Sequence, residues 1–558
     1  MTLLIQAANI THAYGGNQIF RDTQFAIRRG DRVALIGANG AGKSTLLQIA
    51  GRQLKPNAGV VTYHRGLTVG FLSQESSLDP AVTVHDLIAL ASGDLDALEA
   101  HLHALEARMA EPLDDDALTA VMDEHGATLA RLEAKLVGSA GDGETAGARV
   151  LAGLRLPESR WDLPVGRLSG GEKKLVALAQ ILLAEPEVLL LDEPDNHLDL
   201  AAKAWLEERL AAHPGAVALI THDRRLIDRA ANEIFELEDG QITVYPANYT
   251  KYVAQKQIRL ERAAQLRELE EREFKKLKAS AEQLTQWARQ NPKFAPRAEN
   301  QRRKMAEERA RLDRTPVPIL NRRRIAVEFA GERGSTLVLE ATGLAKSFGE
   351  RTIFAPFDLS IRHGEVVGLV GPNGSGKSTL FKMILGQERP SAGSLRLGPS
   401  ITVGYYAQEQ ETLDPKQTPL DLVRSRKALT EQGAISFLNG LLFDRDDALN
   451  RIGNLSGGER ARLQIGVLIL DGANFLLLDE PTNNLDITSI EILESALLDF
   501  DGAILTISHD RYFLDKLCDR TVAIQDGAIH DYPGGFSDYE RASAPPEVTQ
   551  AAGRKGRG

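Results

Sequence analysis

Two glycine-rich stretches carry the most recognisable chemistry in the sequence. Residues 37–44 (GANGAGKS) follow an apolar run at 33–36 and lead into another apolar stretch, in the order expected of a strand, a tight turn and a helix. They fit the phosphate-binding pattern G-x-x-x-x-G-K-[ST] at each defined position. The glycines let backbone N–H groups point at phosphate oxygens at a helix N-terminus. Lys43 would reach the β- and γ-phosphates, and Ser44 would ligate Mg²⁺. The pattern returns at residues 371–378 (GPNGSGKS), which predicts two phosphate-binding sites.

The motifs around these loops also occur twice. The segment Leu-Ser-Gly-Gly-Glu begins at Leu168 and again at Leu455, each time at the same distance before an apolar run that ends in Asp-Glu. The separations from the loop lysine to an upstream aromatic residue and to a downstream glutamine agree as well. The repeated residues are Tyr14, Gln74, Asp192, Glu193 and His222 in the first copy, and Phe348, Gln408, Asp479, Glu480 and His509 in the second. Such a repeat indicates two domains of one fold.

Composition restricts the class of protein. The chain has 558 residues, of which 43% are hydrophobic and 26% are charged, which suits more than one globular domain. Cys518 is the single cysteine, which excludes an intramolecular disulfide and a cysteine-ligated zinc cluster. The N-terminus lacks the pattern of a signal peptide, and no apolar run approaches the roughly 18 residues of a membrane span. We therefore expect a soluble, cytoplasmic protein without a membrane partner.

An insertion at about 92–140 lengthens the first copy. Apolar residues at helical spacing predict two helices that form a hairpin, here called the arm. These residues are Leu95, Leu98, Leu102, Leu105 and Met109 in the first helix, and Leu118, Met122, Leu129, Leu132 and Leu136 in the second. Residues 94–137 include 11 acidic and 3 basic side chains. This charge would repel RNA phosphates, and it favours a protein surface or no partner at all.

A basic segment joins the two copies. Residues 251–324 contain 21 lysine and arginine side chains against 10 aspartate and glutamate, although the whole chain has a net charge of −11. A long helix is predicted, with one side lined by Leu266, Leu269, Leu277 and Leu284. Residues 291–296 (NPKFAP) interrupt it, and a return helix is expected at about 297–314. The alternative is a solvated coiled coil that only spaces the domains.

The tip of this predicted hairpin mixes bases with aromatic side chains, which suits phosphate pairing and base stacking on RNA. The residues predicted to bind RNA are Trp287, Arg289, Lys293, Arg297, Arg302, Arg303 and Lys304.

Together the motifs resemble those of the ATP-binding-cassette ATPases over nearly the whole chain. Two cassettes, an insertion in the first and a charged helical linker resemble the ABC-F family. The resemblance implies an α/β fold with two P-loop cassettes, each a mixed β core with a helical subdomain, joined by a long basic α-helical hairpin. It further implies ATP and Mg²⁺ as ligands, ATPase activity, and the ribosome as partner, with the linker at tRNA and rRNA. We expect domains at 1–246 with the arm, 247–325 and 326–543, a disordered tail at 544–558, and a monomer whose cassettes pair.

The resemblance also assigns catalytic roles. Glu193 and Glu480 would be general bases for the attacking water, and His222 and His509 would contact the γ-phosphate. Tyr14 and Phe348 would stack on adenine. The expected metal ligands and sensors are Ser44, Gln74 and Asp192, and Ser378, Gln408 and Asp479.

Each cassette would complete the ATP site of the other. The signature serine and glycines of the second copy would cap ATP at the first loop, and those of the first copy would cap ATP at the second. These signature residues are Ser169, Gly170 and Gly171, and Ser456, Gly457 and Gly458. The loop residues expected to bind ATP are Gly37, Asn39, Gly40, Gly42, Lys43, Ser44 and Thr45, and Gly371, Asn373, Gly374, Gly376, Lys377, Ser378 and Thr379.

One residue departs from the family pattern. Asp195 follows Glu193 by two positions, where the family usually has threonine and the second copy has Thr482. An added carboxylate could raise the pKa of Glu193 or alter the contact between the cassettes. Both sites keep their lysine, aspartate, glutamate and histidine, so we predict that both hydrolyse ATP, at unequal rates.

Three other functions fit parts of the pattern. A ribosome-protection factor for antibiotic resistance would belong to the same family, although the linker tip has ordinary length. The energy module of a transporter would need membrane subunits on separate chains, and the fused cassettes and basic linker disfavour it. A DNA-associated ATPase is the third, because a basic hairpin binds any polyanion.

Overall fold

The structure is a computed structural model of the whole chain. It describes residues 2–558 apart from 75–77, 93–94, 110–114, 138–142, 197, 315–334, 408–412, 526 and 544–558. The predicted tail at 544–558 therefore lies outside the described residues. The chain divides into two compact units, one formed by Met1–Pro246 with Ile325–Gly558 and the other by Ala247–Arg324. Both cassettes belong to the first unit.

The first cassette is built on a six-stranded sheet in the order β5-β6-β7-β3-β8-β9. All neighbours are parallel except β8 and β9. The central strands are continuous apolar runs with both faces buried, as expected of a parallel sheet covered by helices. The strands are β3 (Arg32–Ile36), β5 (Val69–Leu72), β6 (Val188–Asp192), β7 (Ala216–Ile220), β8 (Glu233–Glu238) and β9 (Gln241–Tyr245).

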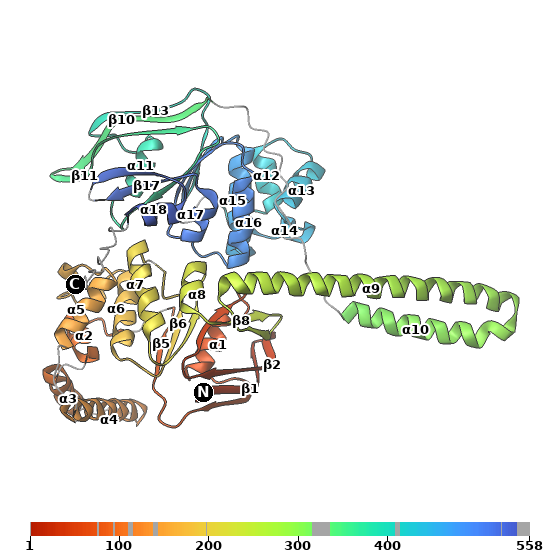
Figure 1. Cartoon of the computed structure of the whole chain (residues 1–558), viewed down its shortest axis with the longest axis horizontal. Coiled ribbons are helices and arrows are strands. Elements are labelled where there is room, and N and C mark those ends of the chain that lie inside the picture. Colours follow the sequence, from red (N-terminus) through yellow and green to blue (C-terminus); the bar gives the residue numbers. More distant parts are fainter. Residues whose placement is uncertain are drawn as a thin grey trace, which may run out of the picture. The chain divides into compact units, whose positions relative to one another are not determined.

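A smaller antiparallel sheet and several helices complete this cassette (Figure 1). The small sheet has the order β2-β1-β4, with β1 (Leu3–Tyr14), β2 (Asn17–Arg28) and β4 (Ala58–Tyr63). One apolar core lies between this sheet, α1 and the large sheet, and a second core lies between the other helices and the large sheet. The helices are α1 (Lys43–Ala50), α2 (Val84–Ser92), α5 (Gly143–Gly153), α6 (Gly170–Leu183), α7 (Leu200–Ala212) and α8 (Arg224–Ala230).

The second cassette repeats this architecture. Its large sheet has the order β14-β15-β16-β12-β17-β18, and its small sheet has the order β11-β10-β13. The strands are β10 (Leu337–Phe348), β11 (Arg351–Arg362), β12 (Val366–Val370), β13 (Ala392–Leu397), β14 (Val403–Tyr406), β15 (Phe475–Asp479), β16 (Ala503–Ile507), β17 (Arg520–Gln525) and β18 (Ala528–Pro533). The helices are α11 (Lys377–Ile384), α12 (Pro419–Arg426), α13 (Glu431–Gly440), α14 (Arg445–Leu449), α15 (Gly457–Leu470), α16 (Ile487–Leu498), α17 (Arg511–Leu517) and α18 (Phe536–Ser543). The predicted fold class of paired P-loop cassettes is confirmed.

The arm is a pair of helices, α3 (Leu95–Met109) and α4 (Asp115–Val137), that pack on each other. On α3 the predicted stripe is correct, because Leu98, Leu102 and Leu105 are buried. On α4 two of the apolar residues from which the helix was predicted, Met122 and Leu129, are exposed, whereas Val121 and Thr128 are buried. The Thr128 hydroxyl donates to the carbonyl oxygen of Glu124 at 2.9 Å, so this polar residue faces inward without losing a hydrogen bond.

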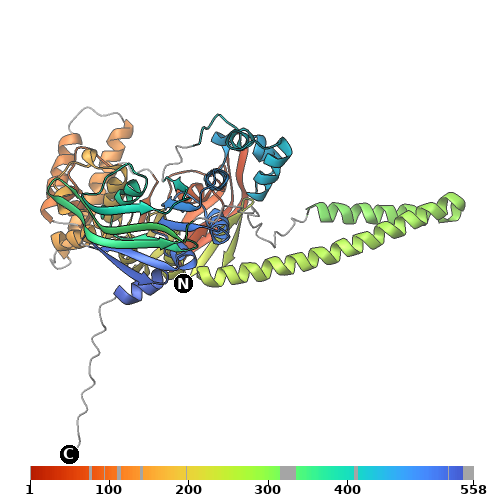
Figure 2. The same ribbon diagram turned by 90° about the horizontal axis from the view of Figure 1, so that it is seen from above.

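The second unit is an antiparallel pair of helices, α9 (Tyr249–Gln290) and α10 (Ala295–Arg314), drawn in green in Figures 1 and 2. Asn291 ends α9, and its side chain accepts from the backbone N–H of Lys293 at 3.1 Å in the short turn (η3, Pro292–Phe294) between the helices. Arg311 of α10 pairs with Glu270 of α9 at 3.1 Å. Leu266 and Leu269 are exposed, so the predicted apolar stripe does not reach this part of α9.

Candidate active site

The two phosphate-binding loops have nearly identical geometry. Each connects a central strand to a helix whose first residue is the loop lysine. The Lys43 ammonium donates to the carbonyl oxygens of Gly37 at 2.8 Å and Ala38 at 3.0 Å. Lys377 makes the equivalent bonds to Gly371 and Pro372. Burial lowers the pKa of both lysines, although nearby carboxylates oppose the shift.

Glycine is required just before each lysine. Gly42 has φ of 97° and Gly376 has φ of 104°, a left-handed conformation that residues with a Cβ rarely adopt. A Cβ on Gly376 would also lie 2.5 Å from the ring of Phe354. The loop therefore lies too close to the small sheet for a side chain at this position. Its backbone N–H groups are at the helix N-terminus, where an anion can be bound.

The predicted metal ligands of the first cassette lie together. Asp192 ends β6, and its carboxylate is hydrogen-bonded by the Ser44 hydroxyl. Both groups offer the oxygen ligands that Mg²⁺ prefers, so these residues fit the ion. Burial raises the pKa of Asp192 and of Asp479. In the second cassette the Tyr405 hydroxyl donates to Asp479 at 3.4 Å. Gln74 follows β5 and is exposed, and Gln408 lies outside the described residues.

The two candidate general bases share an unusual backbone. Glu193 and Glu480 both have φ of 50°, and their N–H groups donate to the end of the neighbouring strand, to Ile220 at 2.8 Å and to Ile507 at 2.9 Å. A positive φ costs a non-glycine residue about 1–3 kcal/mol, and such strain is concentrated at functional sites. The strained backbone is thus held by the sheet in both copies.

Each candidate base lies near its histidine. The distance from Nε2 to the carboxylate is 3.8 Å between His222 and Glu193 and 3.4 Å between His509 and Glu480. Burial and the adjacent Lys43 lower the pKa of His222 to about 4. Burial, together with Lys377 and Lys203, lowers the pKa of His509 to about 3. Both imidazoles are therefore neutral near pH 7.

The surroundings of the two bases differ. The side chain of Glu480 is 8% exposed and accepts the backbone N–H of His509 at 3.1 Å. The side chain of Glu193 is 21% exposed and accepts the amide of Asn196 at 2.7 Å. Burial raises the pKa of Glu480 to about 7. The two sites thus have the same residues but different solvation.

Loops of opposite cassettes meet at both sites. The backbone N–H of Asn39 donates to Asp486 at 3.1 Å, and its side chain donates to the Asn484 carbonyl oxygen at 3.4 Å. Gly457 of the second signature lies against that same carbonyl, since a Cβ there would be 3.2 Å from it. At the other site a cavity of about 630 Å³ is lined by signature residues of the first cassette and loop residues of the second, among them Ser169, Gly171, Pro372 and Asn373.

The signature serines themselves begin helices. Ser169 begins α6 and accepts the N–H of Glu172, whose carboxylate accepts the N–H of Ser169 at 2.8 Å. Ser456 forms the same capping box with Glu459 at α15. Each box fixes the entry of the chain into its helix and satisfies the N–H groups of its serine and its glutamate.

A second cavity, of about 470 Å³, surrounds Lys377 and is also shared. Its lining from the second cassette includes Lys377, Ser378, Thr379, Glu480 and His509. Its lining from the first cassette includes Glu193, Asp195 and Lys203. Side chains of the first cassette therefore reach the site that holds the second loop lysine.

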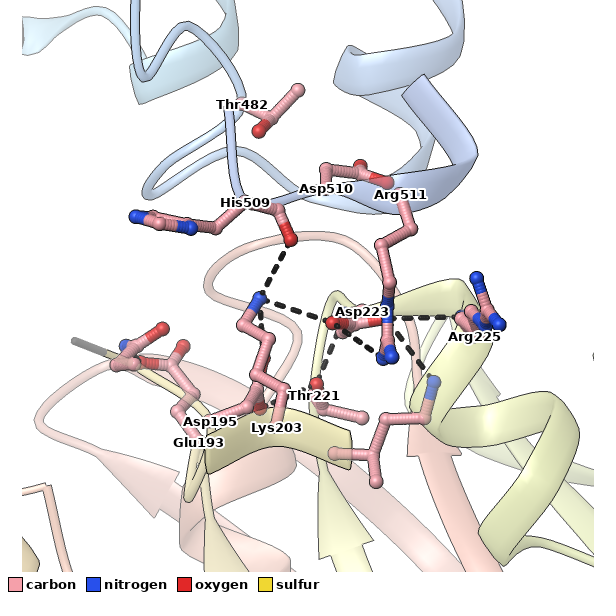
Figure 3. Close-up of polar contacts among 12 residues, drawn as sticks. Glu193, Asp195, Lys203, Thr221, Asp223, Arg225, Thr482, His509, Asp510 and Arg511 are labelled. Carbon is pink, nitrogen blue, oxygen red and sulfur yellow. Dashed lines mark hydrogen bonds and ion pairs between the residues drawn. The ribbon is translucent and has the colours of Figure 1, made fainter. Parts of the chain in front are cut away.

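Asp195 is oriented toward neighbours other than the candidate base (Figure 3). Its carboxylate accepts the Thr221 hydroxyl at 2.6 Å and lies 3.9 Å from the Lys203 ammonium. Burial raises the pKa of Asp195, and Lys203 opposes that shift. The extra carboxylate therefore belongs to a buried polar network at the contact between the cassettes.

Sequence reasoning missed a set of buried ion pairs across this contact. Arg224 of α8 pairs with Glu494 of the second cassette and lies 3.2 Å from Asp510. Arg511 of α17 makes the reciprocal pair with Glu207 of α7. A signal was present, since the same Asp-Arg dipeptide follows the histidine in both copies. We define these four residues, Arg224, Glu494, Arg511 and Glu207, as the reciprocal arginine pairs.

The predicted adenine and RNA contacts are on the surface. Tyr14 and Phe348 are about half exposed at the ends of β1 and β10, so neither is a core residue. In the second unit Trp287 is exposed, and its ring centroid is 5.8 Å from that of Phe294. The basic tip residues are all exposed, namely Arg289, Lys293, Arg297, Arg302, Arg303 and Lys304.

Comparison with protein families matches segments of both cassettes. The family described as ABC transporter matches residues 20–196 and 354–483, and a further match of the same description covers 235–324. No helix among the described residues has the length and apolar character of a membrane span.

Two similar proteins are named "Energy-dependent translational throttle protein EttA". The protein from Haemophilus influenzae is 36% identical over 94% of this chain and 92% of its own length. The protein from Mycobacterium tuberculosis (strain H37Rv) is 34% identical over 95% and 94%.

Two solved structures share the fold. The RNase-L inhibitor superposes with a TM-score of 0.57 at 20% identity, over 96% of this chain and 92% of that one. The archaeal ribosome recycling factor aABCE1, in complex with stalk protein aP1, superposes with a TM-score of 0.55 at 21% identity over the same shares. At this identity the likeness extends to the fold alone.

Proposed function

Because the chain belongs to the ABC-F family of ATP-binding-cassette ATPases, we propose that it hydrolyses ATP at two shared sites and uses the cycle to act on the translating ribosome. The observation that carries this proposal is the repeated grouping of loop lysine, strained glutamate and neutral histidine, each facing loops of the other cassette. Similarity to proteins named as translational throttles supports translation as the process. A protein with this role works in the cytoplasm, as a monomer whose own cassettes pair.

Hydrolysis would depend mainly on positioning. The loop N–H groups and Lys43 or Lys377 would hold the phosphates, and the opposite signature would close over them. Glu193 or Glu480 would accept a proton from the attacking water, and the neutral histidine beside it would orient the γ-phosphate. Mg²⁺, held by Ser44 and Asp192 or by Ser378 and Asp479, would neutralise developing phosphate charge when bound.

The helical hairpin supplies the surface for RNA. From Trp287 to Lys304 the hairpin has six exposed bases against one exposed acid, Glu299, and the rings of Trp287 and Phe294, whose centroids are 5.8 Å apart, offer an aromatic face. Because the hairpin joins the two cassettes in the sequence, closure of the cassettes on ATP would change its pose. ATP binding would thereby be coupled to tRNA and rRNA contacts.

The test is co-sedimentation with ribosomes. A Glu193→Gln, Glu480→Gln double variant should accumulate in the ATP-bound state and sediment with ribosomes only when ATP is present. Reversal of Arg297, Arg302 and Arg303 to glutamate should weaken this binding and reduce its salt dependence. Reversal of Lys275, Lys276 and Lys278, which are exposed on α9 away from the tip, is the matched control for net charge.

Three outcomes would redirect the proposal. No ribosome binding in either nucleotide state would refute the translational role and leave the ATPase. Equal weakening by the control reversals would refute a role for the tip. Competition by duplex DNA at concentrations where tRNA has no effect would favour a DNA-associated ATPase.

A further inference from the structure

The two cassettes differ at a pair of positions beside the catalytic residues. The first cassette has Asp195 and Lys203. The second has Thr482 and Ile490 at the same sequence separations from its catalytic glutamate. All four lie at the contact between the cassettes, and three are buried while Lys203 is nearly so. Only the first copy has both an acid and a base at these two positions, which makes the pair a candidate for a shared role.

Lys203 reaches across to the second cassette (Figure 3). Its ammonium donates to Asp223 at 3.0 Å and lies 3.9 Å from Asp195, both in its own cassette. It also donates to the backbone carbonyl oxygen of His509 at 3.3 Å. Burial disfavours the ammonium, but Asp223 and Asp195 raise the pKa of Lys203 above its ordinary value. The group therefore stays charged and can hold a carbonyl oxygen strongly.

The contacted residue is part of the second active site. The N–H of His509 donates to Glu480 at 3.1 Å, and its ring nitrogen lies 3.4 Å from the same carboxylate. The hydrogen bond from Lys203 to the carbonyl oxygen of His509 restrains the peptide group that follows this histidine. The histidine is thus held between its own general base and a cation of the opposite cassette.

The counterpart of Lys203 in the second cassette cannot make the reciprocal contact. Ile490, the counterpart of Lys203, is apolar and has no donor to offer the His222 carbonyl. Thr482, the counterpart of Asp195, lies 3.5 Å from the Ser508 hydroxyl. The second cassette therefore has no equivalent of the Lys203 ammonium at this position of the first site.

We propose that Lys203 is a positioning residue for ATP hydrolysis at the Lys377 site, supplied by the first cassette, with Asp195 as its counter-ion. The inference rests on the proposed ATPase function and adds a direction to it. The Lys377 site gains the Lys203 ammonium only when the first cassette is docked against it, whereas the Lys43 site meets loops of the second cassette but has isoleucine at the position that corresponds to Lys203. Closure therefore controls hydrolysis at one site more than at the other.

The test measures each site in a variant in which the general base of the other site has been replaced. In Glu193→Gln the remaining hydrolysis comes from the Lys377 site, and in Glu480→Gln it comes from the Lys43 site. Adding Lys203→Met should lower kcat roughly 10-fold in the first background, the value of one charge-assisted hydrogen bond, with KM for ATP changed less than about 2-fold. In the second background the loss of kcat should stay below about 2-fold. Lys203→Arg, which keeps the charge and the donors, should restore part of the activity.

A second variant guards against misfolding. Lys203→Met removes the ammonium beside buried Asp195 and leaves Asp223 with the more distant Arg511 at 3.8 Å. The double variant Asp195→Thr, Lys203→Ile instead installs the residues that the second copy has at these positions. The double variant should show the same site-selective loss of kcat with a midpoint of urea unfolding close to that of the parent protein. Full activity of either variant at the Lys377 site would overturn the inference, as would equal losses in both backgrounds or no rescue by arginine.

The failure of the proposed function is recognised separately. If the unsubstituted protein hydrolyses no ATP, the proposed function is refuted, and the inference with it. If each glutamine background hydrolyses ATP and Lys203 has no selective effect, only the inference is refuted. If one glutamine substitution alone abolishes all hydrolysis, the independence of the sites assumed by the inference is wrong.

Discussion

Removal of the Arg511 guanidinium should weaken the pairing of the cassettes. The side chains of Arg511 and Glu207 are each 1% exposed and come from different cassettes. Arg511 also lies 3.8 Å from Asp223. Burial lowers the pKa of Arg511 to about 10, which still leaves it charged at neutral pH. In Arg511→Met, Glu207 would remain buried without this partner.

The expected cost follows from that burial. Breaking a buried pair by removing one partner destabilises a protein by about 3–5 kcal/mol, because the remaining charge is left in a medium of low polarity. Glu207 keeps a second, half-exposed arginine, Arg229, at 3.5 Å, which places the cost near the lower end, at about 3 kcal/mol. Arg511→Met combined with Glu207→Leu removes both charges and should recover most of the loss, to within about 1 kcal/mol of the parent protein.

The assay is urea unfolding of the nucleotide-free chain, compared by transition midpoint at equal slope, because a chain of several domains need not unfold in two states. Arg225→Met is the matched control. Arg225 also pairs across the cassettes, with Glu540, but that carboxylate is 44% exposed, so the loss should be at most about 1 kcal/mol. A loss below 1 kcal/mol for Arg511→Met, or no recovery in the double variant, would refute the reasoning.

Three further outcomes are expected. Glu193→Gln and Glu480→Gln should lower steady-state ATP hydrolysis by different factors, because the two carboxylates differ in burial; equal losses would contradict this. Gly376→Ala should destabilise the protein by roughly 1–3 kcal/mol, because φ is positive and the added Cβ would contact the small sheet. Gly386→Ala is the control, since Gly386 also has a positive φ but open space around its Cβ position. An equal shift in melting temperature for both variants would exclude a contribution from the contact with the small sheet. Burial lowers the pKa of His222 from 6.5 to about 4, so between these pH values the unfolded chain binds a proton that the folded chain does not. The free energy of unfolding in urea should therefore fall as pH drops from about 6.5 toward 4. The same dependence of stability on pH in His222→Gln would argue against this cause.

Much of the fold was available from local patterns. Apolar runs of five residues predict buried strands, and a glycine-rich turn followed by lysine predicts the helix N-terminus that holds phosphate. Equal spacing between the copies was enough to predict the same order of motifs around two sheets. The end of α9 at Gln290 follows from Asn291 and Pro292, because proline cannot continue a helix.

Helix faces were predicted less well. On α4 the apolar spacing that predicted the helix includes Met122 and Leu129, which are exposed, whereas the packed face contains Val121 and Thr128. Sequence spacing does not show which of two faces, offset by one residue, packs against the neighbouring helix. It also does not show that a threonine hydroxyl can donate a hydrogen bond to a backbone carbonyl oxygen of the preceding turn. On α9 the leucines at 266 and 269 face solvent for a related reason, since the return helix decides which side is covered.

By itself, the sequence determined the two phosphate loops, the acidic strand ends, the signature segments and the basic hairpin, because each is a short segment whose residues encode its own conformation and charge. The tertiary structure alone decided that Lys203 meets the carbonyl of His509, 306 residues away, and that Asp195 faces Thr221. It also decided that the reciprocal arginine pairs cross between the cassettes. These contacts depend on how two folded surfaces dock, and docking geometry is set by the summed packing of many side chains rather than by any local pattern.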